Sequence, residues 1–366
     1  MSPYPAEVRW TLALNNALVA QPAYDGSDGY FPIQGDRVAA YDLRQGTERW
    51  VVSARPLSTP AVGGGLLFLE QAGSLSALHL KDGSVAWTVP ITEKLAVPLV
   101  WDNGRLVAGL PASILSFNAE DGTSQWRRDL SARPNRTPSV AGDGVYVPMA
   151  DGRVLALRAD NGEILWERRL PQAANDILVS GQQLFVGSND NYLYCLNTND
   201  GSTRWRSPRT GADVVSRPAA DDDRVYFVSL DNVLRAVNRS HGVQQWKKGL
   251  AFRPAWSPII GADTVMVAGS QGPLLALYRK DGTPGGELAT GADLIAASPY
   301  AFESPLALGP IIVVVTRNLK LGATVKAVSH RIEPPVIPLG VLPGLVPAPG
   351  TPSAIPGEAP ARESSK

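Results

Sequence analysis

The sequence VLALRADNGEILW, residues Val154 to Trp166, sets a thirteen-residue pattern that returns along almost the whole chain. Aligned on its glycine, the other complete copies are VAAYDLRQGTERW (38–50), LSALHLKDGSVAW (75–87), ILSFNAEDGTSQW (114–126), LYCLNTNDGSTRW (193–205) and LRAVNRSHGVQQW (234–246). Two copies are incomplete: LLALYRKDGTPGG (274–286) has Gly286 where tryptophan is expected, and VKAVSHRIE (325–333) keeps only the first half. Such self-similarity at a regular period indicates a repeat architecture.

Each copy of the pattern predicts a β-hairpin. Val154 and Ala156 are apolar and two positions apart, and the alternation that follows them is typical of a strand with one buried face. The pair Asn161 and Gly162 then predicts a turn, because Asn, Asp and Gly tolerate a left-handed backbone and the polar side chains hydrogen-bond locally. A second strand follows and carries the tryptophan, four residues after the glycine.

A second marker precedes each hairpin, usually a proline that opens a short apolar stretch. Proline lacks the backbone donor of a sheet ladder, so it suits the start of a strand that has no neighbour on one side. Between marker and hairpin lies another β-rich piece, such as GVYVPM (144–149), so each repeat holds four short strands. The marker positions are Pro22, Pro60, Pro98, Pro138, Ile177, Pro218, Pro258 and Pro299.

Four strands in about forty residues, repeated, predict the blades of a β-propeller. The third position of each hairpin is a small residue, and there are eight: Ala40, Ala77, Ser116, Ala156, Cys195, Ala236, Ala276 and Ala327. The last repeat lacks a fourth strand, whereas EVRWTLAL (7–14) is a fourth strand with no repeat before it. We therefore predict an all-β, eight-bladed β-propeller with four antiparallel strands per blade. Its ring is closed by the N-terminal strand, which removes exposed sheet edges.

Whole-chain properties limit the choice of partners. The 34 basic and 34 acidic residues balance, so no global field attracts nucleic acid or an anionic membrane, and only local patches are left open. No apolar run approaches the ~18 residues needed to cross a bilayer, and we expect no membrane insertion of this chain. Residues 1–20 lack the cationic start and apolar core of a secretory signal.

The composition changes near residue 332. The propeller repeats account for residues 1–332, whereas residues 333–366 are rich in proline and end in ESSK. A segment of this kind cannot build a core, and we predict an extended, disordered, polyproline-like tail. Such a tail is either a spacer or a ligand for a groove-type partner.

The pattern A-x-D-x-x-x-G-x-x-x-W is similar to the tryptophan-docking repeat of eight-bladed propellers of the pyrroloquinoline-quinone (PQQ) type, over residues 7–332. Two branches of that superfamily differ in what they imply. The quinoprotein alcohol dehydrogenases are enzymes. The BamB-like family of outer-membrane assembly lipoproteins consists of non-catalytic scaffolds for β-barrel assembly. One fold hosts many functions, so the residues must separate the two.

Candidate catalytic groups are few, which favours the scaffold branch. Quinoprotein dehydrogenases are longer, carry insertions between blades and stack the quinone on adjacent cysteines. This chain has one cysteine, Cys195, at a repeat position that Ala156 and Ala236 share, which indicates a small buried core residue. The three histidines fall at different repeat phases, and no acidic cluster has calcium-ligand spacing. We expect no catalytic residue, no metal and no cofactor; a PQQ-dependent dehydrogenase or a degenerate quinoprotein relative is the alternative.

The candidate partner-binding residues lie just ahead of the innermost strands. In a propeller these segments ring the central channel on one face, and loops on a rigid scaffold commonly carry binding residues. Arginine and tryptophan are frequent interface anchors. The candidates are Arg133, Arg136, Asp176, Asp213, Arg217, Arg253 and Trp256. The alternative is that the charged members pair with one another across the channel mouth.

The resemblance also implies a partner and a location. A BamB-like scaffold implies a protein partner from the β-barrel assembly machinery, a monomer within a complex, and the periplasm or cell envelope if a leader is missing from this chain. In that family an Asp-x-Asp stretch before an inner strand contacts the partner. Asp213 alone resembles it here, five residues ahead of Pro218, so the identity of the partner stays open.

Overall fold

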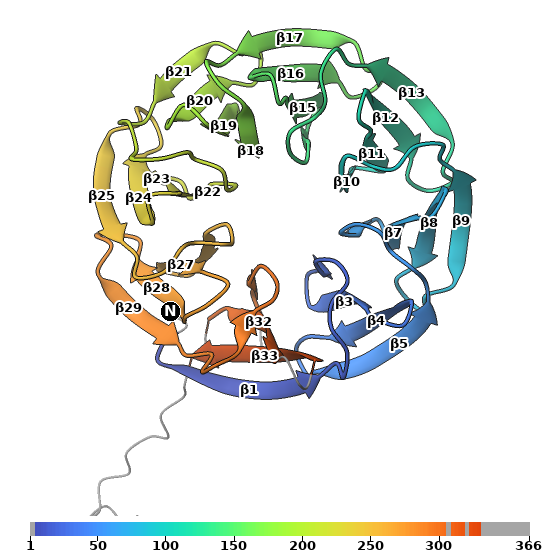
Figure 1. Cartoon of the computed structure of the whole chain (residues 1–366), viewed down its shortest axis with the longest axis horizontal. Helices are drawn as coiled ribbons and strands as arrows, with labels where there is room; N and C mark the ends of the chain where they lie inside the picture. The colour runs from blue at the N-terminus through green and yellow to red at the C-terminus, as the bar shows by residue number, and fades with distance from the viewer. Residues whose placement is uncertain (1–3, 305–308, 319–321, 331–366) are drawn as a thin grey trace, which may run out of the picture. The chain divides into compact units, whose positions relative to one another are not determined.

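The computed structural model describes residues 4–304, 309–318 and 322–330, which form a ring of eight small antiparallel sheets around a central channel (Figure 1). The prediction of an eight-bladed, all-β propeller is confirmed. In the described part of the chain, no helix has the length and apolarity needed to cross a membrane. The predicted tail, residues 333–366, lies outside the described residues.

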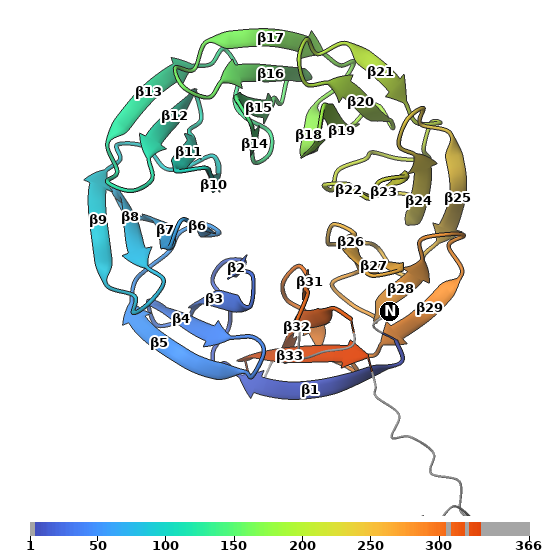
Figure 2. The same ribbon diagram turned by 180° about the vertical axis from the view of Figure 1, so that it is seen from behind.

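The strands of each blade follow the chain from the channel outward, and the inner ones are best seen in Figure 2. Blades 1 to 4 are β2 (Ala23–Asp25), β3 (Asp28–Ile33), β4 (Arg37–Asp42) and β5 (Thr47–Ser53); β6 (Ala61–Gly63), β7 (Leu66–Gln71), β8 (Ser74–His79) and β9 (Val85–Pro90); β10 (Val97–Asp102), β11 (Arg105–Gly109), β12 (Ser113–Asn118) and β13 (Ser124–Asp129); β14 (Ser139–Ala141), β15 (Gly144–Pro148), β16 (Arg153–Arg158) and β17 (Ile164–Arg169). Blades 5 to 7 are β18 (Ala174–Ser180), β19 (Gln183–Ser188), β20 (Leu193–Asn197) and β21 (Thr203–Arg206); β22 (Ala219–Ala220), β23 (Arg224–Ser229), β24 (Val233–Asn238) and β25 (Gln244–Gly249); β26 (Ile259–Gly261), β27 (Thr264–Ala268), β28 (Leu274–Tyr278) and β29 (Pro284–Leu288).

Blade 8 joins the two ends of the described chain. It consists of β31 (Tyr300–Phe302), β32 (Ile311–Asn318), β33 (Gly322–His330) and, as its outer strand, β1 (Ala6–Ala13). β1 pairs antiparallel with β33, as predicted, and places Trp10 opposite Ala327. The structure adds one strand that the sequence did not predict, β30 (Leu294–Ile295), which pairs with the far end of β32.

Seven tryptophans join consecutive blades in the same way. The Nε1 of each donates to a backbone carbonyl in the hairpin turn of the next blade, at 2.7–3.1 Å. Its ring covers the glycine of that turn: a Cβ on Gly162 would meet the Trp126 ring at 2.5 Å. With φ at +70°, Gly162 also has the left-handed backbone that favours glycine. Each repeat therefore contains both residues, because the tryptophan of one blade packs on the glycine of the next.

In every blade except blade 7, the small residue of the hairpin lies directly opposite the tryptophan of its own blade. Ala156 pairs with Trp166, and Cys195 pairs with Trp205. A larger side chain at this position would compete with the indole for the space between blades. This cross-strand pairing explains why the position is small in every repeat.

The junction between blades 7 and 8 uses a different aromatic residue. Gly286 occupies the tryptophan position, opposite Ala276. The buried ring of Tyr4 packs on it, 2.5 Å from where a Cβ would be, and the Tyr4 hydroxyl donates to the Leu274 carbonyl at 3.4 Å. The missing indole is thus replaced by a ring from the N-terminal segment of the neighbouring blade.

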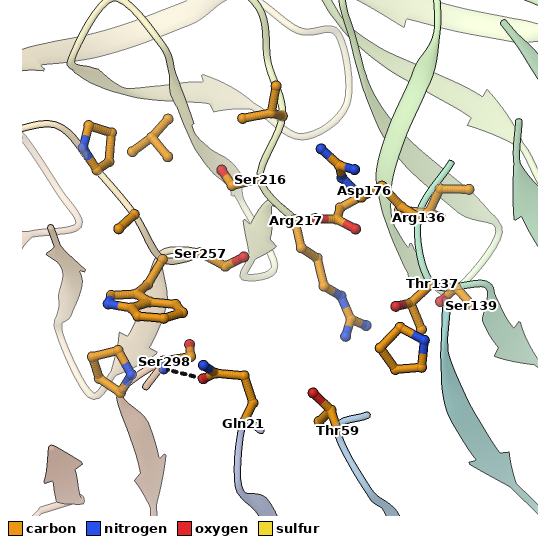
Figure 3. A pocket seen from close by; sticks show the side chains of 18 of the residues that line it. Gln21, Thr59, Arg136, Thr137, Ser139, Asp176, Ser216, Arg217, Ser257 and Ser298 are labelled. Carbon is orange, nitrogen blue, oxygen red and sulfur yellow. Dashed lines mark hydrogen bonds between the residues drawn. The ribbon is translucent and has the colours of Figure 1, made fainter. Parts of the chain in front are cut away.

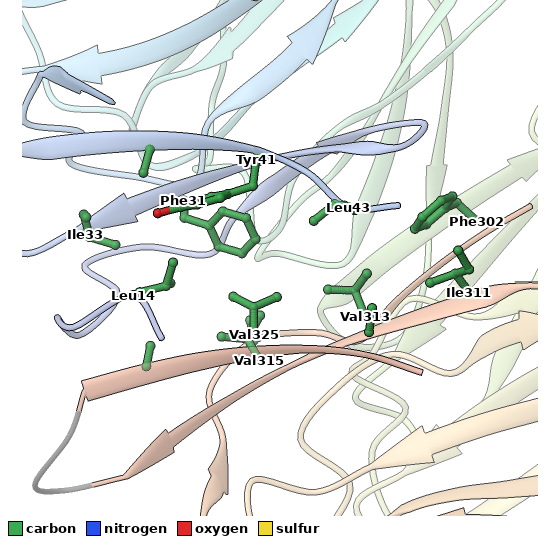
Figure 4. Close-up of a cluster of buried hydrophobic side chains, with 14 residues drawn as sticks. Leu14, Phe31, Ile33, Tyr41, Leu43, Phe302, Ile311, Val313, Val315 and Val325 are labelled. Carbon is green, nitrogen blue, oxygen red and sulfur yellow. The ribbon is translucent and has the colours of Figure 1, made fainter. Parts of the chain in front are cut away.

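The hydrophobic core is divided among the blade junctions. Each of the eight junctions has its own cluster of buried side chains. Figure 4 shows the cluster between blades 8 and 1, where Phe31 and Tyr41 meet Val313, Val315 and Val325. These apolar contacts hold the channel-lining loops at fixed separations.

Candidate functional site

Eight loops lead from the outer strand of one blade to the inner strand of the next. Because the strands alternate in direction, all eight lie on one side of the ring, which we call the mouth face; the Asp-Gly and Asn-Gly turns lie on the other, the hairpin face. Inside the mouth face is a cavity of about 660 Å³, to which every blade contributes. This volume is in the range of ligand sites, ~300–1,000 Å³.

Four of the seven candidate residues line this cavity: Arg136, Asp176, Arg217 and Trp256. The other three, Arg133, Asp213 and Arg253, lie on the same loops but outside its lining. In Figure 3, Arg217 points into the middle of the cavity. Across the described ranges, none of the seven side chains forms an ion pair within 4.0 Å. Asp176 nevertheless interacts electrostatically with Arg136 and Arg217, as the alternative of mutual pairing expects.

A chain of amide hydrogen bonds holds three neighbouring mouth loops together. Asn135 of blade 4 donates to the Asn175 side chain of blade 5 at 3.0 Å and to the Ala174 carbonyl at 2.7 Å. Asn175, which is buried, donates to the Val214 carbonyl of blade 6 at 2.9 Å. Asn135 and Asn175 each directly precede a cavity residue, and Val214 lies three residues before Arg217. These hydrogen bonds therefore hold the loops that carry Arg136, Asp176 and Arg217 in fixed positions relative to one another.

The loop that carries Arg217 is also bonded to residues 230 and 231 of blade 6. The Asp231 carboxylate accepts from the backbone N–H of Gly211 at 2.9 Å and pairs with Arg235 at 2.6 Å. The Leu230 backbone N–H donates to the Asp213 carbonyl at 3.0 Å. Asp213 therefore positions the loop through its backbone.

Electrostatically the cavity is cationic. Burial raises the pKa of the Asp176 carboxyl, and the nearby Arg136 and Arg217 guanidiniums only partly oppose this. Burial likewise lowers the pKa of Arg217, against the effect of Asp176, but a guanidinium stays protonated at neutral pH. The Arg217 side chain is exposed to the cavity that the eight blades surround. Two cations and one weakened anion leave an excess of positive charge that suits an anionic partner group.

The predicted partner-binding residues leave out a set of small polar side chains in the cavity wall. They are residues that directly precede the strand-opening proline, and their hydroxyls line the cavity beside the arginines. The members are Thr59, Thr137, Ser257 and Ser298. Gln21 has the same place in blade 1, where its Oε1 accepts from the Ser298 N–H at 3.1 Å (Figure 3). Their shared repeat position was the available signal.

The ring of tryptophan-joined blades and its cationic mouth define an eight-bladed, tryptophan-docking propeller with a cavity at one end of its channel. The family described as "Outer membrane protein assembly factor BamB" matches residues 4–94, 34–178 and 174–299, and the chain belongs to this family. One relative of that name, from Moranella endobia (strain PCIT), is 26% identical over 242 residues, 61% of this chain and 61% of the relative. The alignment thus spans less than two thirds of that relative's length.

Solved structures share the fold. BamB from Moraxella catarrhalis has a TM-score of 0.70 at 17% identity, over 90% of this chain and 99% of that one. The quinohemoprotein alcohol dehydrogenase from Comamonas testosteroni has a TM-score of 0.68 at 12% identity, over 90% of this chain and 77% of that one. At identities this low the likeness is one of fold, and it does not separate scaffold from dehydrogenase.

The cavity residues do not fit a quinone held with a divalent cation. Asp176 is the one acidic residue of the lining, and its raised pKa makes it a poor cation ligand. Elsewhere in the described residues, no group of three His, Cys, Asp or Glu has metal-binding geometry. Cys195 is fully buried on β20, away from the cavity lining, and burial raises the pKa of its thiol to about 12. This agrees with the prediction that Cys195 is a core residue.

Proposed function

We propose that this protein is a non-catalytic scaffold in outer-membrane β-barrel protein assembly, and that its mouth face binds a protein component of that machinery. Membership of the BamB family supports this role. The proposal places the protein in the periplasm or cell envelope, as a monomer within a complex.

The observation that carries the proposal is the rigid mouth. Asn135, Asn175 and the Val214 carbonyl join three loops whose side chains include two arginines without an ion-pair partner in the described residues. Anchors held in place before binding lose little conformational freedom on association, so they contribute more to affinity. Trp256, half-buried at the cavity edge, adds an aromatic anchor of the kind enriched in interface hot spots.

The experiment is capture of the β-barrel assembly machinery by the purified protein. We expect the double variant Arg217→Glu, Trp256→Ala to weaken capture by about thirtyfold or more, since a hot-spot anchor contributes about 2 kcal/mol or more. The melting temperature should fall only slightly, because the Arg217 side chain is exposed and Trp256 is half-buried at the edge of the cluster between blades 7 and 8.

Two controls lie on the hairpin face. Asp121→Lys changes an exposed turn residue, and Arg158→Glu repeats the charge change of Arg217→Glu at another exposed arginine. Both should capture the partner normally. If the hairpin-face variants lost the partner while the double variant kept it, the assignment of the binding face would be wrong.

A further inference from the structure

The outer strands of blades 3 to 6 form a continuous arc of the rim with an unusual charge. β13, β17, β21 and β25 follow one another around the ring in both views (Figures 1 and 2). They carry two acidic residues, Asp129 and Glu167. Their eight basic residues are Arg127, Arg128, Arg168, Arg169, Arg204, Arg206, Lys247 and Lys248. We call these four strands the basic arc; its charge is 8 − 2 = +6.

The other four outer strands have no such excess. β29, β1, β5 and β9 carry two basic residues, Arg9 and Arg49, and three acidic ones, Glu7, Glu48 and Glu287. Their charge is 2 − 3 = −1. A chain with no net charge therefore has a rim that is strongly basic on one half, which whole-chain charge could not reveal.

The repeat itself turns most of these side chains outward. In each strand of the basic arc the basic residues lie within three positions of a docking tryptophan, which is buried and bonded to the next blade. The indole takes the buried side of the strand, so the residues next to it point to the outer surface. Arg128, Arg168 and Lys248, two positions after a tryptophan, lie on its side of the strand, where Arg128 donates to the Gly162 carbonyl of the next blade at 2.7 Å. Six of the eight basic residues are exposed and the other two are half-buried.

Few of these charges are neutralised within the protein. In the described residues only Arg127 forms an ion pair, with Asp129 at 2.8 Å. Arg168 donates to the Thr203 hydroxyl at 3.0 Å, and Arg206 lies 4.5 Å from the centre of the Tyr192 ring. These contacts leave the positive charges intact.

Exposed aliphatic side chains lie on the basic arc, as they also do on the other outer strands at Val8, Val51 and Val85. Ile164 and Leu165 on β17 are 50% and 40% exposed, and Val243, next to β25, is 55% exposed. Long, flexible basic side chains on a convex rim match a broad, diffuse negative charge better than a single ligand group. The added aliphatic groups suit the boundary between lipid headgroups and acyl chains.

We propose that the basic arc lies against a membrane surface containing anionic phospholipids. Several Lys and Arg residues side by side attract such a surface within about a Debye length, which is ~8 Å at physiological ionic strength. In this orientation the rim meets the membrane, so the mouth face points along the bilayer and stays open. The inference does not rest on the proposed scaffold role.

The test is co-sedimentation of the full chain with vesicles. We expect binding to vesicles with about 30% phosphatidylglycerol to exceed binding to pure phosphatidylcholine by roughly tenfold or more, and to fall as salt rises from about 0.05 M to about 0.5 M. The variant Arg168→Gln, Arg169→Gln, Lys247→Gln, Lys248→Gln should lose roughly tenfold or more of that binding. These side chains are at the surface, and a melting curve verifies that the variant folds.

A matched control removes the same charge elsewhere. Arg37→Gln, Arg55→Gln, Lys81→Gln, Lys94→Gln changes four exposed basic residues outside the basic arc, and it should bind vesicles like the unaltered protein. Equal binding to both lipids, or equal loss in both variants, would overturn the proposal. Binding to soluble polyglutamate without binding to vesicles would overturn it too, and would assign the basic arc to an acidic protein.

Discussion

At the scale of single residues, Asp231 connects the loop that carries Arg217 to the rest of its blade. Its carboxylate joins Arg235, the Ser229 hydroxyl and the backbone of Gly211, and so ties the loop that carries Arg217 to the body of blade 6. Burial raises the pKa of Asp231, but the hydrogen bonds from Arg235, Ser229 and Gly211 outweigh it and hold the pKa at about 2, below the ordinary 3.8. The folded state therefore favours the ionised carboxylate.

This shift predicts a pH-dependent contribution to stability. A depressed carboxylate pKa stabilises the fold above the unfolded pKa, and the contribution is lost as pH falls through the folded pKa. Asp231→Asn should lower the free energy of unfolding by about 2 kcal/mol at neutral pH. The gap to the unaltered protein should narrow below about pH 4 in urea titrations. Asp25→Asn, at the exposed end of β2, serves as the control. A gap independent of pH would assign the effect to packing.

The residues that line the cavity were only partly predictable from the sequence. The repeat phase identified Arg136, Asp176, Arg217 and Trp256, because all lie one or two residues before a strand-opening position. The residue before a proline is held extended, and Thr59, Thr137, Arg217, Ser257 and Ser298, which have this place in five blades, all line the cavity. Small hydroxyl residues there were left out of the predicted set because their type is also common in solvated loops. Whether a charged neighbour lines the cavity, as Arg133 does not, depends on the loop path.

At the scale of elements, β1 is the strand on which the ring depends. Its pairing with β33 completes blade 8, Trp10 docks on blade 1, and Tyr4 just before it covers Gly286 of blade 7. One short segment therefore bonds to its own blade and packs against both neighbours. Its loss would expose the edge of β33 and remove aromatic rings from two junctions.

Deletion of residues 1–13 should lower the melting temperature by roughly 10 °C or more, because it removes the half-buried Trp10 and the buried Tyr4 together with a whole strand, and truncation of one large core aromatic alone costs about 3–5 kcal/mol. Trp10→Ala should act in the same direction with a smaller effect. A synthetic peptide of residues 4–14 added to the truncated protein should restore stability. Unchanged melting of the truncated protein would show that the shared blade does not support the ring.

The strands were more predictable than the junctions between them. Hairpins, blade count and closure by the N-terminal strand all follow from period-two alternation, Asp-Gly turns and the spacing of tryptophans. The replacement of tryptophan by Tyr4 at Gly286 was not predictable, because the two residues are far apart in sequence and belong to different repeats. β30 was missed because a two-residue strand carries no periodicity.

At the scale of the whole molecule, the channel is the place where scaffold and dehydrogenase would differ. The blades pack through eight separate clusters, so the channel needs no core of its own and its lining is free to vary. In this protein the lining has more guanidinium than carboxylate groups. Such a lining favours an anionic group and disfavours a divalent cation.

We expect calorimetry with pyrroloquinoline quinone and Ca²⁺ to detect no stoichiometric binding of the pair, and no dye reduction with alcohols or sugars. The physical reason is that Asp176 is a single, weakly ionised carboxyl beside two cations. Quinone without Ca²⁺ is the necessary control, since its own carboxylates are attracted to Arg217. Stoichiometric, Ca²⁺-dependent binding with dye reduction would favour a dehydrogenase over a non-catalytic scaffold.

The pairing of β1 with β33 also sets the order of events during synthesis. A ribosome makes β1 first and its partner last, and at about 5–20 residues per second the interval is on the order of tens of seconds. Throughout that time the growing chain has an unpaired strand at its front. When many chains are made close together, β1 of one molecule meets the unfinished eighth blade of another, and we expect domain-swapped dimers to form by this route.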